Sequence, residues 1–240
     1  MTGLFRRRRF LRPAAPRDGY DVVVVGGGVN GLSLAYNLAE RHGIRDVAVF
    51  ERSYVGSGGS GRNTQVVRAN YNTPETVPLY RESLAIWRTL SQELDLNLQF
   101  STQGELDLCH TQDSLEVERD KALLNAAYGV PNEILTADEV ARACPLVDLT
   151  GGGELPVIGA SYHPPGSFAR HDSVVWGYAA AAQARGVDVH EHAGVAGIDV
   201  GDDGRCRGVV TDDGRRVAAG VVVGAVAGWS SELAATAGVR

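Results

Sequence analysis

Three glycines, Gly26, Gly28 and Gly31, form a G-x-G-x-x-G pattern between an apolar, β-branched run and a segment of helical periodicity. This pattern at a strand-to-helix turn is typical of pyrophosphate binding. The first glycine permits the tight turn, the second lets a phosphate approach the backbone, and the third allows close helix–strand packing. Phosphate would then lie on the first N–H groups of the helix, at Val29 and Asn30, where the helix dipole is positive.

A carboxylate follows at the distance that this chemistry requires. The run VAVFE reads as a second buried strand, and its last residue, Glu51, lies twenty residues past Gly31. A carboxylate at that place can accept hydrogen bonds from an adenosine ribose. The complete strand–helix–strand unit therefore predicts dinucleotide binding, whereas a glycine-rich turn without a ligand leaves Glu51 unexplained.

A polar, glycine-rich loop, ERSYVGSGGSGRNTQVVRANY, follows the second strand and carries Arg62, Asn63, Thr64 and Arg68. An NAD domain would continue here into another helix and strand, so the loop favours FAD, whose extended form it can cover. Asn63 and Thr64 can hydrogen-bond the cofactor, with a solvated loop as the alternative. Arg68 can bind a carboxylate through two parallel hydrogen bonds, or it is a surface residue of a strand.

A second group of candidates, Arg170, His171 and Asp172, precedes a predicted helix over residues 172–186. His171 could be a general base, an anchor for a cofactor or a helix-start residue. Asp172 is expected to be the N-cap, and Arg170 could hold a phosphate. The residues alone favour the helix-start role for His171.

Two further patterns favour structure over chemistry. His190 and His192 alternate on a predicted strand, but no third ligand has suitable spacing, so we expect an exposed strand face and no metal site. The pair Cys109-His110 has no recognisable nucleophile pattern around it and is expected to be structural.

The elements that position these residues divide the chain into four parts. We expect a basic N-terminal arm over 1–18, the first part of a dinucleotide-binding domain over 19–95, and part of a substrate domain over 96–168. The cofactor domain then resumes over 169–240, with a β-meander at about 195–220. Helices are predicted over 73–94, 114–130 and 136–145, the last with a capping box formed by Thr136 and Glu139.

Composition limits the classes of partner. The chain has 240 residues, of which 44% are apolar, and a formal net charge of −6, which argues against nucleic-acid binding. No apolar run reaches transmembrane length. The three widely spaced cysteines favour a reduced, cytoplasmic setting. The basic stretch RRRRFLR is followed by PAAPRDG rather than an apolar segment, which argues against an export signal.

At the family level, the segments VVVVGGGVNGLSLAYNLA, VFER, GSGRNTQVVR and VVVGAVAGWS resemble the D-amino-acid oxidase superfamily of FAD-dependent oxidoreductases. The segments GRNTQVVRANY, RHDSVVWGYA and ACPLV are most similar to the beta subunits of heterotetrameric sarcosine oxidases. The resemblance implies an α/β fold. It consists of a Rossmann-like FAD-binding domain with an inserted α+β substrate domain, C-terminally incomplete relative to the family.

The resemblance also assigns roles. It implies that FAD contacts come from the following residues: Gly26, Gly28, Val29, Asn30, Gly31, Glu51, Arg52, Gly59, Arg62, Asn63, Thr64, Val66 and Val195. It implies that Arg68 faces the substrate carboxylate. It shifts His171 from a helix-start residue to the attachment point of a covalent FMN, with Arg170 at the FMN phosphate.

The expected activity is oxidative demethylation of a small secondary amino acid such as sarcosine, giving glycine, a one-carbon unit and hydrogen peroxide. The resemblance implies other subunits of a hetero-oligomer as partners. Two alternatives stay open: another FAD amino-acid oxidase or dehydrogenase, of the glycine oxidase kind, and a truncated fragment that binds FAD without turnover.

Overall fold

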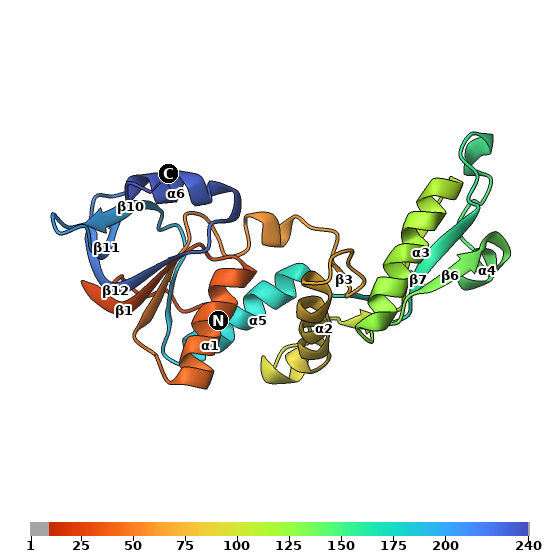
Figure 1. Cartoon of the computed structure of the whole chain (residues 1–240). Coiled ribbons are helices and arrows are strands. Elements are labelled where there is room, and N and C mark those ends of the chain that lie inside the picture. Colours follow the sequence, from red (N-terminus) through yellow and green to blue (C-terminus); the bar gives the residue numbers. More distant parts are fainter. Residues whose placement is uncertain (1–9, 240) are drawn as a thin grey trace, which may run out of the picture. The chain divides into compact units, whose positions relative to one another are not determined.

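The computed structural model describes residues 10–239, which divide into two compact units (Figure 1). Unit 1 comprises residues 10–64, 94–96 and 171–239, and unit 2 comprises residues 65–93 and 97–170. Half of the predicted basic arm, residues 1–9, lies outside the described residues.

Unit 1 is built on a six-stranded sheet in the order β10-β11-β12-β1-β2-β9. Strands β12, β1, β2 and β9 are parallel, whereas β10, β11 and β12 run antiparallel in succession. The strands are β1 (Gly19–Val25), β2 (Val47–Phe50), β9 (Asp188–His190), β10 (Val195–Val200), β11 (Cys206–Thr211) and β12 (Arg216–Gly224). The mixed α/β fold with a parallel core is therefore confirmed.

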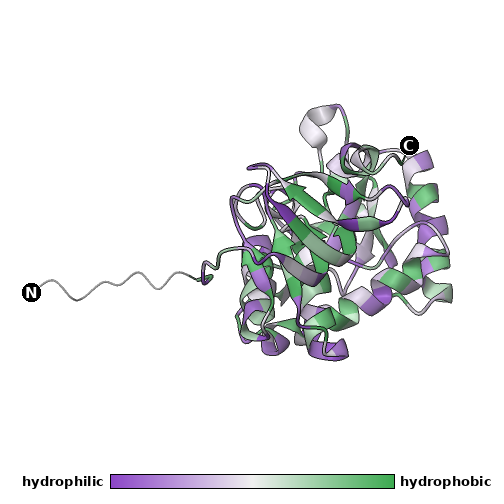
Figure 2. Ribbon diagram, turned by 90° about the vertical axis from the view of Figure 1, so that its left-hand side faces the viewer, coloured by the Kyte–Doolittle hydropathy of each residue, from purple (hydrophilic) through white to green (hydrophobic). Residues whose placement is uncertain are grey.

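Apolar residues on both faces of β1 and β2 explain why these strands form the centre of the sheet. Val23, Val24, Val47 and Val49 are completely buried, and the strands of this sheet are mostly green in the hydropathy view (Figure 2). Continuous apolar runs of this kind are typical of parallel strands covered on both faces.

The helices and short turns of unit 1 are α1 (Val29–His42), η1 (Gly59–Gly61), α5 (His171–Ala184), η3 (Ala227–Trp229) and α6 (Ser230–Thr236). Helices α1 and α5 pack against each other, with the rings of Tyr36 and Tyr178 centred 5.6 Å apart. Gly43 ends α1 in the left-handed conformation, with φ of 69°.

Unit 2 contains two small sheets, β3-β8-β4 and β5-β7-β6. Its elements are β3 (Val66–Val67), α2 (Thr76–Glu93), β4 (Ser101–Thr102), β5 (Glu105–Cys109), α3 (Gln112–Ala127), β6 (Glu133–Thr136), α4 (Ala137–Ala143), η2 (Gly151–Gly153), β7 (Gly159–His163) and β8 (Ser167–Phe168). Helices α3 and α4 lie against the β5-β7-β6 sheet.

The extent of the units differs from the predicted boundary at residue 95. Helix α2 belongs to unit 2, because its Val77 and Leu84 form an apolar cluster with Ala69 and Val130 of that unit. Strands β4 and β5 lie on either side of Gln103 and Gly104 but do not pair with each other. Strand β4 pairs with β8 and β5 pairs with β7, and the Gln103 and Gly104 N–H groups donate to the Gly166 carbonyl between β7 and β8.

Candidate functional site

The G-x-G-x-x-G segment between β1 and α1 in unit 1 has no room for a Cβ at three positions, Gly26, Gly27 and Gly31. Gly26 has φ of +112°, and a Cβ there would lie 2.4 Å from the Ala225 carbonyl oxygen. A Cβ on Gly31 would lie 2.1 Å from the carbonyl oxygen of Gly26. These contacts give the tight turn and the close helix–strand approach that the sequence pattern predicts.

Gly28 has a different environment, because a Cβ there would meet the end of a side chain rather than backbone. It is the N-cap of α1 without a side-chain cap, and a Cβ there would meet within 4 Å only the Ser60 Oγ, at 3.1 Å. The Val29 N–H donates to this hydroxyl at 2.9 Å, and Asn30 is exposed. A concave backbone surface at the N-terminus of a fourteen-residue helix suits the pyrophosphate of a dinucleotide.

Glu51 lies directly beside this turn and is buried. Its Oε2 accepts a hydrogen bond from the Gly27 N–H at 2.9 Å, while its Oε1 accepts from the Ser53 N–H at 2.9 Å and the Ser57 hydroxyl at 3.2 Å. These bonds fix the direction of the carboxylate and tie the turn to the loop after β2. The remaining lone pairs of the two oxygens are available to ribose hydroxyls.

The polar loop of residues 51–64 curls over its own backbone. The Asn63 side-chain amide donates to the Ser60 carbonyl at 2.8 Å, close to Gly59 in η1, whereas Arg62 and Thr64 are exposed. Val66, the remaining predicted FAD contact of this segment, lies in β3 of unit 2.

Arg52 and Val195 are two further predicted FAD contacts in unit 1. The Arg52 guanidinium lies 4.1 Å from the centroid of the Trp229 ring, in a cation–π contact. Val195 begins β10 and packs against the core of the sheet, so only its backbone is available to a ligand.

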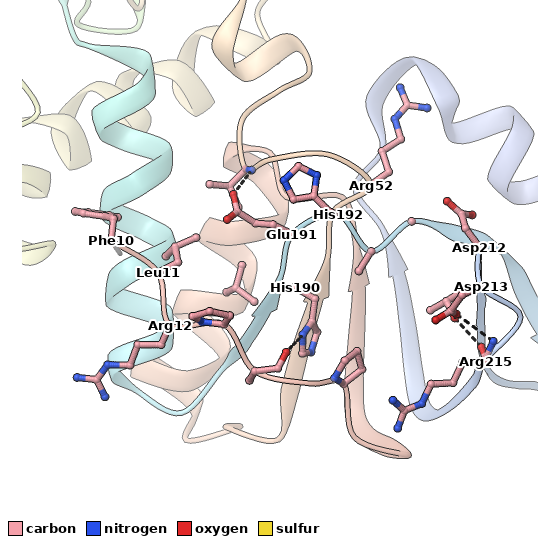
Figure 3. Close-up of a pocket in the computed structure, with 18 of the residues that line it drawn as sticks. Phe10, Leu11, Arg12, Arg52, His190, Glu191, His192, Asp212, Asp213 and Arg215 are labelled. Carbon is pink, nitrogen blue, oxygen red and sulfur yellow. Dashed lines mark hydrogen bonds between the residues drawn. The ribbon is translucent and has the colours of Figure 1, made fainter. Parts of the chain in front are cut away.

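A pocket of about 850 Å³ opens beside Arg52 in unit 1 (Figure 3). Its walls come from the arm at residues 10–16, the connection from β9 to β10, and the turn around Asp212 and Asp213. Figure 3 shows Glu191 and His192 between Arg52 and the arm. The glycines of the β1–α1 turn do not belong to the described lining, so this pocket is separate from the predicted pyrophosphate cradle.

His171 is the first residue of α5 and lies next to the loop rather than out in solvent. A Cβ on Gly61 would be 4.0 Å from its Cδ2 atom. Its Nδ1 is buried and has no hydrogen-bond partner among the described residues.

The structure differs from the prediction for Asp172, and it places Arg170 in unit 2. Because α5 begins at His171, Asp172 lies in the first turn and is not the N-cap, and its Oδ1 accepts from the Ser173 N–H at 2.9 Å. Arg170 belongs to unit 2, where its N–H donates to the Leu98 carbonyl at 2.9 Å.

In unit 2, Arg68 lies among acidic and amide side chains. Its Nη1 is 3.3 Å from Glu105 Oε1, 3.5 Å from Asn70 Oδ1 and 3.6 Å from Asp107 Oδ2. Lys121 is the second cation of this cluster, with its Nζ 2.6 Å from Asp107 Oδ2.

The pKa values of Glu105 and Asp107 are shifted in opposite directions. Burial raises the pKa of Glu105, and the nearby charge of Asp107 adds to the effect. Burial is also the largest single effect on Asp107 and opposes its ionisation, but the hydrogen bond and charge of Lys121, with smaller contributions from Glu105 and Arg68, together hold the pKa of Asp107 below its ordinary value. Asp107 is therefore matched mainly with Lys121, which leaves Glu105 as the closer partner of Arg68.

The expectation of an exposed histidine face at His190 and His192 is wrong for His190. His190 is buried, and its ring is hydrogen-bonded to the Ala14 carbonyl at 3.1 Å and to the Tyr20 hydroxyl at 3.1 Å. His192 lies beyond the end of β9 and is exposed. The described residues contain no group of three or more acidic, histidine or cysteine side chains that could hold a metal.

Sequence reasoning did not single out Ser60, Asn70 or Glu105. Ser60 approaches Gly28 only because the loop folds back, and Asn70 and Glu105 meet Arg68 from separate segments. The buried Asn70 within the RANY segment carries no distinguishing signal other than its closeness to Arg68 in the sequence.

The geometry above defines the class of protein: a mixed α/β fold whose β1–α1 turn has the shape of a dinucleotide cradle. Comparison with protein families places the chain more specifically. Residues 21–240 match the family model described as "FAD dependent oxidoreductase", and the chain belongs to this family.

Individual relatives agree with this family. The chain is 40% identical to the sarcosine oxidase subunit beta of Arthrobacter sp over 93% of its own length and 55% of the relative's. It is 38% identical to the corresponding subunit of Rhizobium meliloti (strain 1021), over 95% of the chain and 54% of the relative. The chain thus spans about half the length of these curated relatives.

Solved structures share the fold. The L-proline dehydrogenase of P. horikoshii matches with a TM-score of 0.84 and 27% identity, covering 94% of this chain and 57% of that chain. The glycine oxidase of Geobacillus kaustophilus matches with a TM-score of 0.81 and 27% identity, covering 93% and 60%. Within residues 10–239, no helix is both long and apolar enough to cross a membrane.

Proposed function

We propose that this chain contributes to the FAD-dependent oxidation of a small secondary amino acid, sarcosine, to glycine, a one-carbon unit and hydrogen peroxide. The observation that carries the proposal is the 40% identity to a sarcosine oxidase subunit beta over 93% of the chain. Glycine oxidase and sarcosine dehydrogenase relatives at 27% identity are more distant.

The residues of unit 1 fit FAD. The open backbone at Gly28 would take the pyrophosphate on the N–H groups of Val29 and Asn30, while Gly26 and Gly31 keep the turn narrow. Glu51, held by three hydrogen bonds, would accept from the ribose hydroxyls. The remaining proposed contacts in unit 1 come from Arg52, Gly59, Arg62, Asn63, Thr64 and the backbone of Val195. Val66, in unit 2, is the last proposed contact.

The chain's own contribution to the reaction is to bind and orient the amine. FAD, when bound, supplies the hydride acceptor. Arg68 would hold the substrate carboxylate through two parallel hydrogen bonds, which turns the N-methyl carbon toward a fixed position. Orientation of this kind matters more than strong acid–base catalysis, because the cofactor carries the redox chemistry.

The direct test is to purify the chain with FAD, to quantify the flavin that it retains, and to assay amine oxidation with oxygen or a dye as acceptor. We expect about one FAD per chain and a higher kcat/KM for sarcosine than for glycine or proline. A preference for glycine would instead support a glycine oxidase-like enzyme, which the fold match to glycine oxidase favours as the second candidate. Bound FAD with no turnover of any of the amines would leave a binding fragment.

We also propose that His171 carries a covalent FMN, with Arg170 near its phosphate. The support is the resemblance of the RHD segment to sarcosine oxidase beta subunits and the buried Nδ1 without a partner in the described part of the chain. A ring nitrogen of neutral imidazole would bond to the flavin methyl carbon in place of one hydrogen, which leaves as a proton. The flavin would keep two electrons from this step, and oxygen, the acceptor of the proposed reaction, would take them.

This proposal predicts flavin that survives denaturation. After acid precipitation and desalting, about one flavin per chain should remain attached to the wild-type polypeptide, and His171→Ala should abolish the retained fraction. His42→Ala, at an exposed position on α1, serves as the matched control and should retain it. Complete release of flavin from the wild type would contradict covalent attachment.

Other subunits of a hetero-oligomer are the proposed partners, because the sarcosine oxidase relatives are themselves named as subunits. The cytoplasmic location expected from the cysteine usage stays a prediction.

A further inference from the structure

The acidic and amide partners of Arg68 in the described part of the chain all contact the same nitrogen, Nη1. The Glu105, Asn70 and Asp107 contacts lie at 3.3 to 3.6 Å from Nη1. The Tyr71 side chain also interacts with the guanidinium, and its ring centroid lies 5.1 Å from the guanidinium carbon. None of these acidic and amide contacts uses the opposite edge, Nε and Nη2. That edge presents the two parallel N–H groups that a carboxylate binds in bidentate fashion.

The side chains of Arg68 and Glu105 differ in how far they are exposed. The Arg68 side chain is 31% exposed, whereas the Glu105 side chain is 16% exposed. The Arg68 side chain is therefore more exposed than the carboxylate that holds it.

The anchor is itself held in place. Asn70 is completely buried, and its amide donates to Glu105 Oε2 at 2.9 Å while its carbonyl oxygen faces Arg68. One carboxylate oxygen of Glu105 thus contacts Arg68 and the other contacts Asn70. This arrangement fixes both the Glu105 rotamer and the orientation of the Asn70 amide.

The sheet of unit 2 brings these segments together. Glu105 begins β5 and pairs in register with His163 of β7. The buried His163 accepts a hydrogen bond from the Ala69 N–H at its Nε2, 3.3 Å away. Two neighbouring strands therefore contact the segment of residues 68–70, one through the Arg68 side chain and the other through the backbone.

We propose that Glu105 and Asn70 are positioning residues that hold Nη1 of Arg68 and keep its Nε–Nη2 edge ready for a substrate carboxylate. The inference rests on the proposed function, since it assigns Arg68 to the carboxylate. Fixing the guanidinium beforehand reduces the side-chain entropy lost on binding and sets the direction from which the amino acid approaches. Asp107 is not part of this pair, because Lys121 contacts it more closely.

The test compares two ligands that differ only in the carboxylate, sarcosine and sarcosine amide, by titration calorimetry on the flavin-loaded chain. Wild type should bind sarcosine more tightly than the amide. Glu105→Ala should weaken sarcosine binding about tenfold and leave amide binding unchanged. Glu105→Gln alone would place its amide N–H group against the N–H group of Asn70, because both Glu105 oxygens act as acceptors. The double variant Glu105→Gln/Asn70→Asp restores every donor–acceptor pair and should recover most of the loss.

Control variants separate the possible outcomes. Glu133→Ala removes an exposed carboxylate at the start of β6 in the same unit and should change neither affinity. Arg68→Lys should abolish the preference for the carboxylate. If Arg68→Lys does so but Glu105→Ala does not, the positioning role is wrong while the role of Arg68 stands.

Two results would contradict the proposed carboxylate site as well as the positioning role. If Arg68→Lys leaves the preference intact, or if the wild type has none, both the positioning role and the proposed carboxylate site fail. Misfolding of Glu105→Ala would weaken both ligands equally and lower the melting temperature. In that case the double variant Glu105→Gln/Asn70→Asp decides: retention of the carboxylate preference supports the proposal, and its loss contradicts it.

Discussion

The glycines of the β1–α1 turn are constrained for different reasons. Gly26 and Gly31 are required by the protein's own backbone, which a Cβ would meet at 2.4 and 2.1 Å. Gly28 is less constrained by the fold, because a Cβ there would meet only the Ser60 Oγ, at 3.1 Å, and this hydroxyl can rotate away. A glycine that the fold does not require is best explained by a ligand that approaches it.

This difference predicts separate phenotypes for two alanine variants. Gly28→Ala should keep the melting temperature of the FAD-free chain and weaken FAD binding by about tenfold or more, because the added methyl group occupies the phosphate surface. Gly31→Ala should lower both the melting temperature of the FAD-free chain and its affinity for FAD, because the methyl group collides with the backbone. Gly228→Ala, an exposed glycine with open space around it, is the control for both measurements. Unchanged FAD affinity of Gly28→Ala would argue against the cradle.

Among the elements, the start of helix α4 could be predicted from local sequence, whereas the pairing of strand β5 could not. The capping box of Thr136 and Glu139 is present as predicted, with the Thr136 N–H donating to Glu139 Oε2 at 2.7 Å. Strand β5, by contrast, pairs with β7, which lies some fifty residues further along the chain, rather than with the adjacent β4. A cap depends on side chains three residues apart, whereas strand pairing depends on distant segments.

Removal of the cap should loosen α4 locally. Thr136→Ala should cost about 1 kcal/mol, so that the amides of α4 exchange with solvent roughly fivefold faster. Thr136→Ser retains the hydroxyl and should exchange at nearly the wild-type rate. Hydrogen exchange followed by mass spectrometry measures both, with the amides of α1 as the internal reference. An unchanged rate in α4 of Thr136→Ala would mean that tertiary packing alone holds the helix.

At the scale of the whole molecule, each unit contains one buried histidine. His190 lies in unit 1 and His163 in unit 2, and burial lowers the pKa of both. His163 contacts the Pro131 carbonyl through Nδ1 at 2.6 Å and the Ala69 N–H through Nε2 at 3.3 Å, which only the neutral ring can satisfy together.

These two histidines should make the chain sensitive to acid. Below a pH of about 6.5, the ordinary histidine pKa, the unfolded chain binds protons that the folded chain excludes, so stability falls as the pH drops toward the lowered folded pKa. His163→Asn and His190→Asn should each flatten the loss of melting temperature between about pH 7 and pH 5. His42→Asn, at an exposed position, should follow the wild type. Parallel profiles for all four proteins would contradict the prediction.

The sequence by itself determined the βαβ unit, its glycine pattern and Glu51, because strand, turn and helix signals lie within about thirty residues and each follows local rules. It also indicated the family, which the comparisons confirm. These parts of the site could be predicted because their spacing along the chain is fixed by the geometry of one supersecondary unit.

Only the tertiary structure decided which distant residues meet. It placed Ser60 against the start of α1, His171 beside Gly61, and Glu105 and Asn70 around one nitrogen of Arg68. It also buried His190, which the alternating pattern had suggested was exposed. The physical reason is that burial and side-chain contacts depend on segments far apart in the sequence, and no local spacing encodes which of them will pack together.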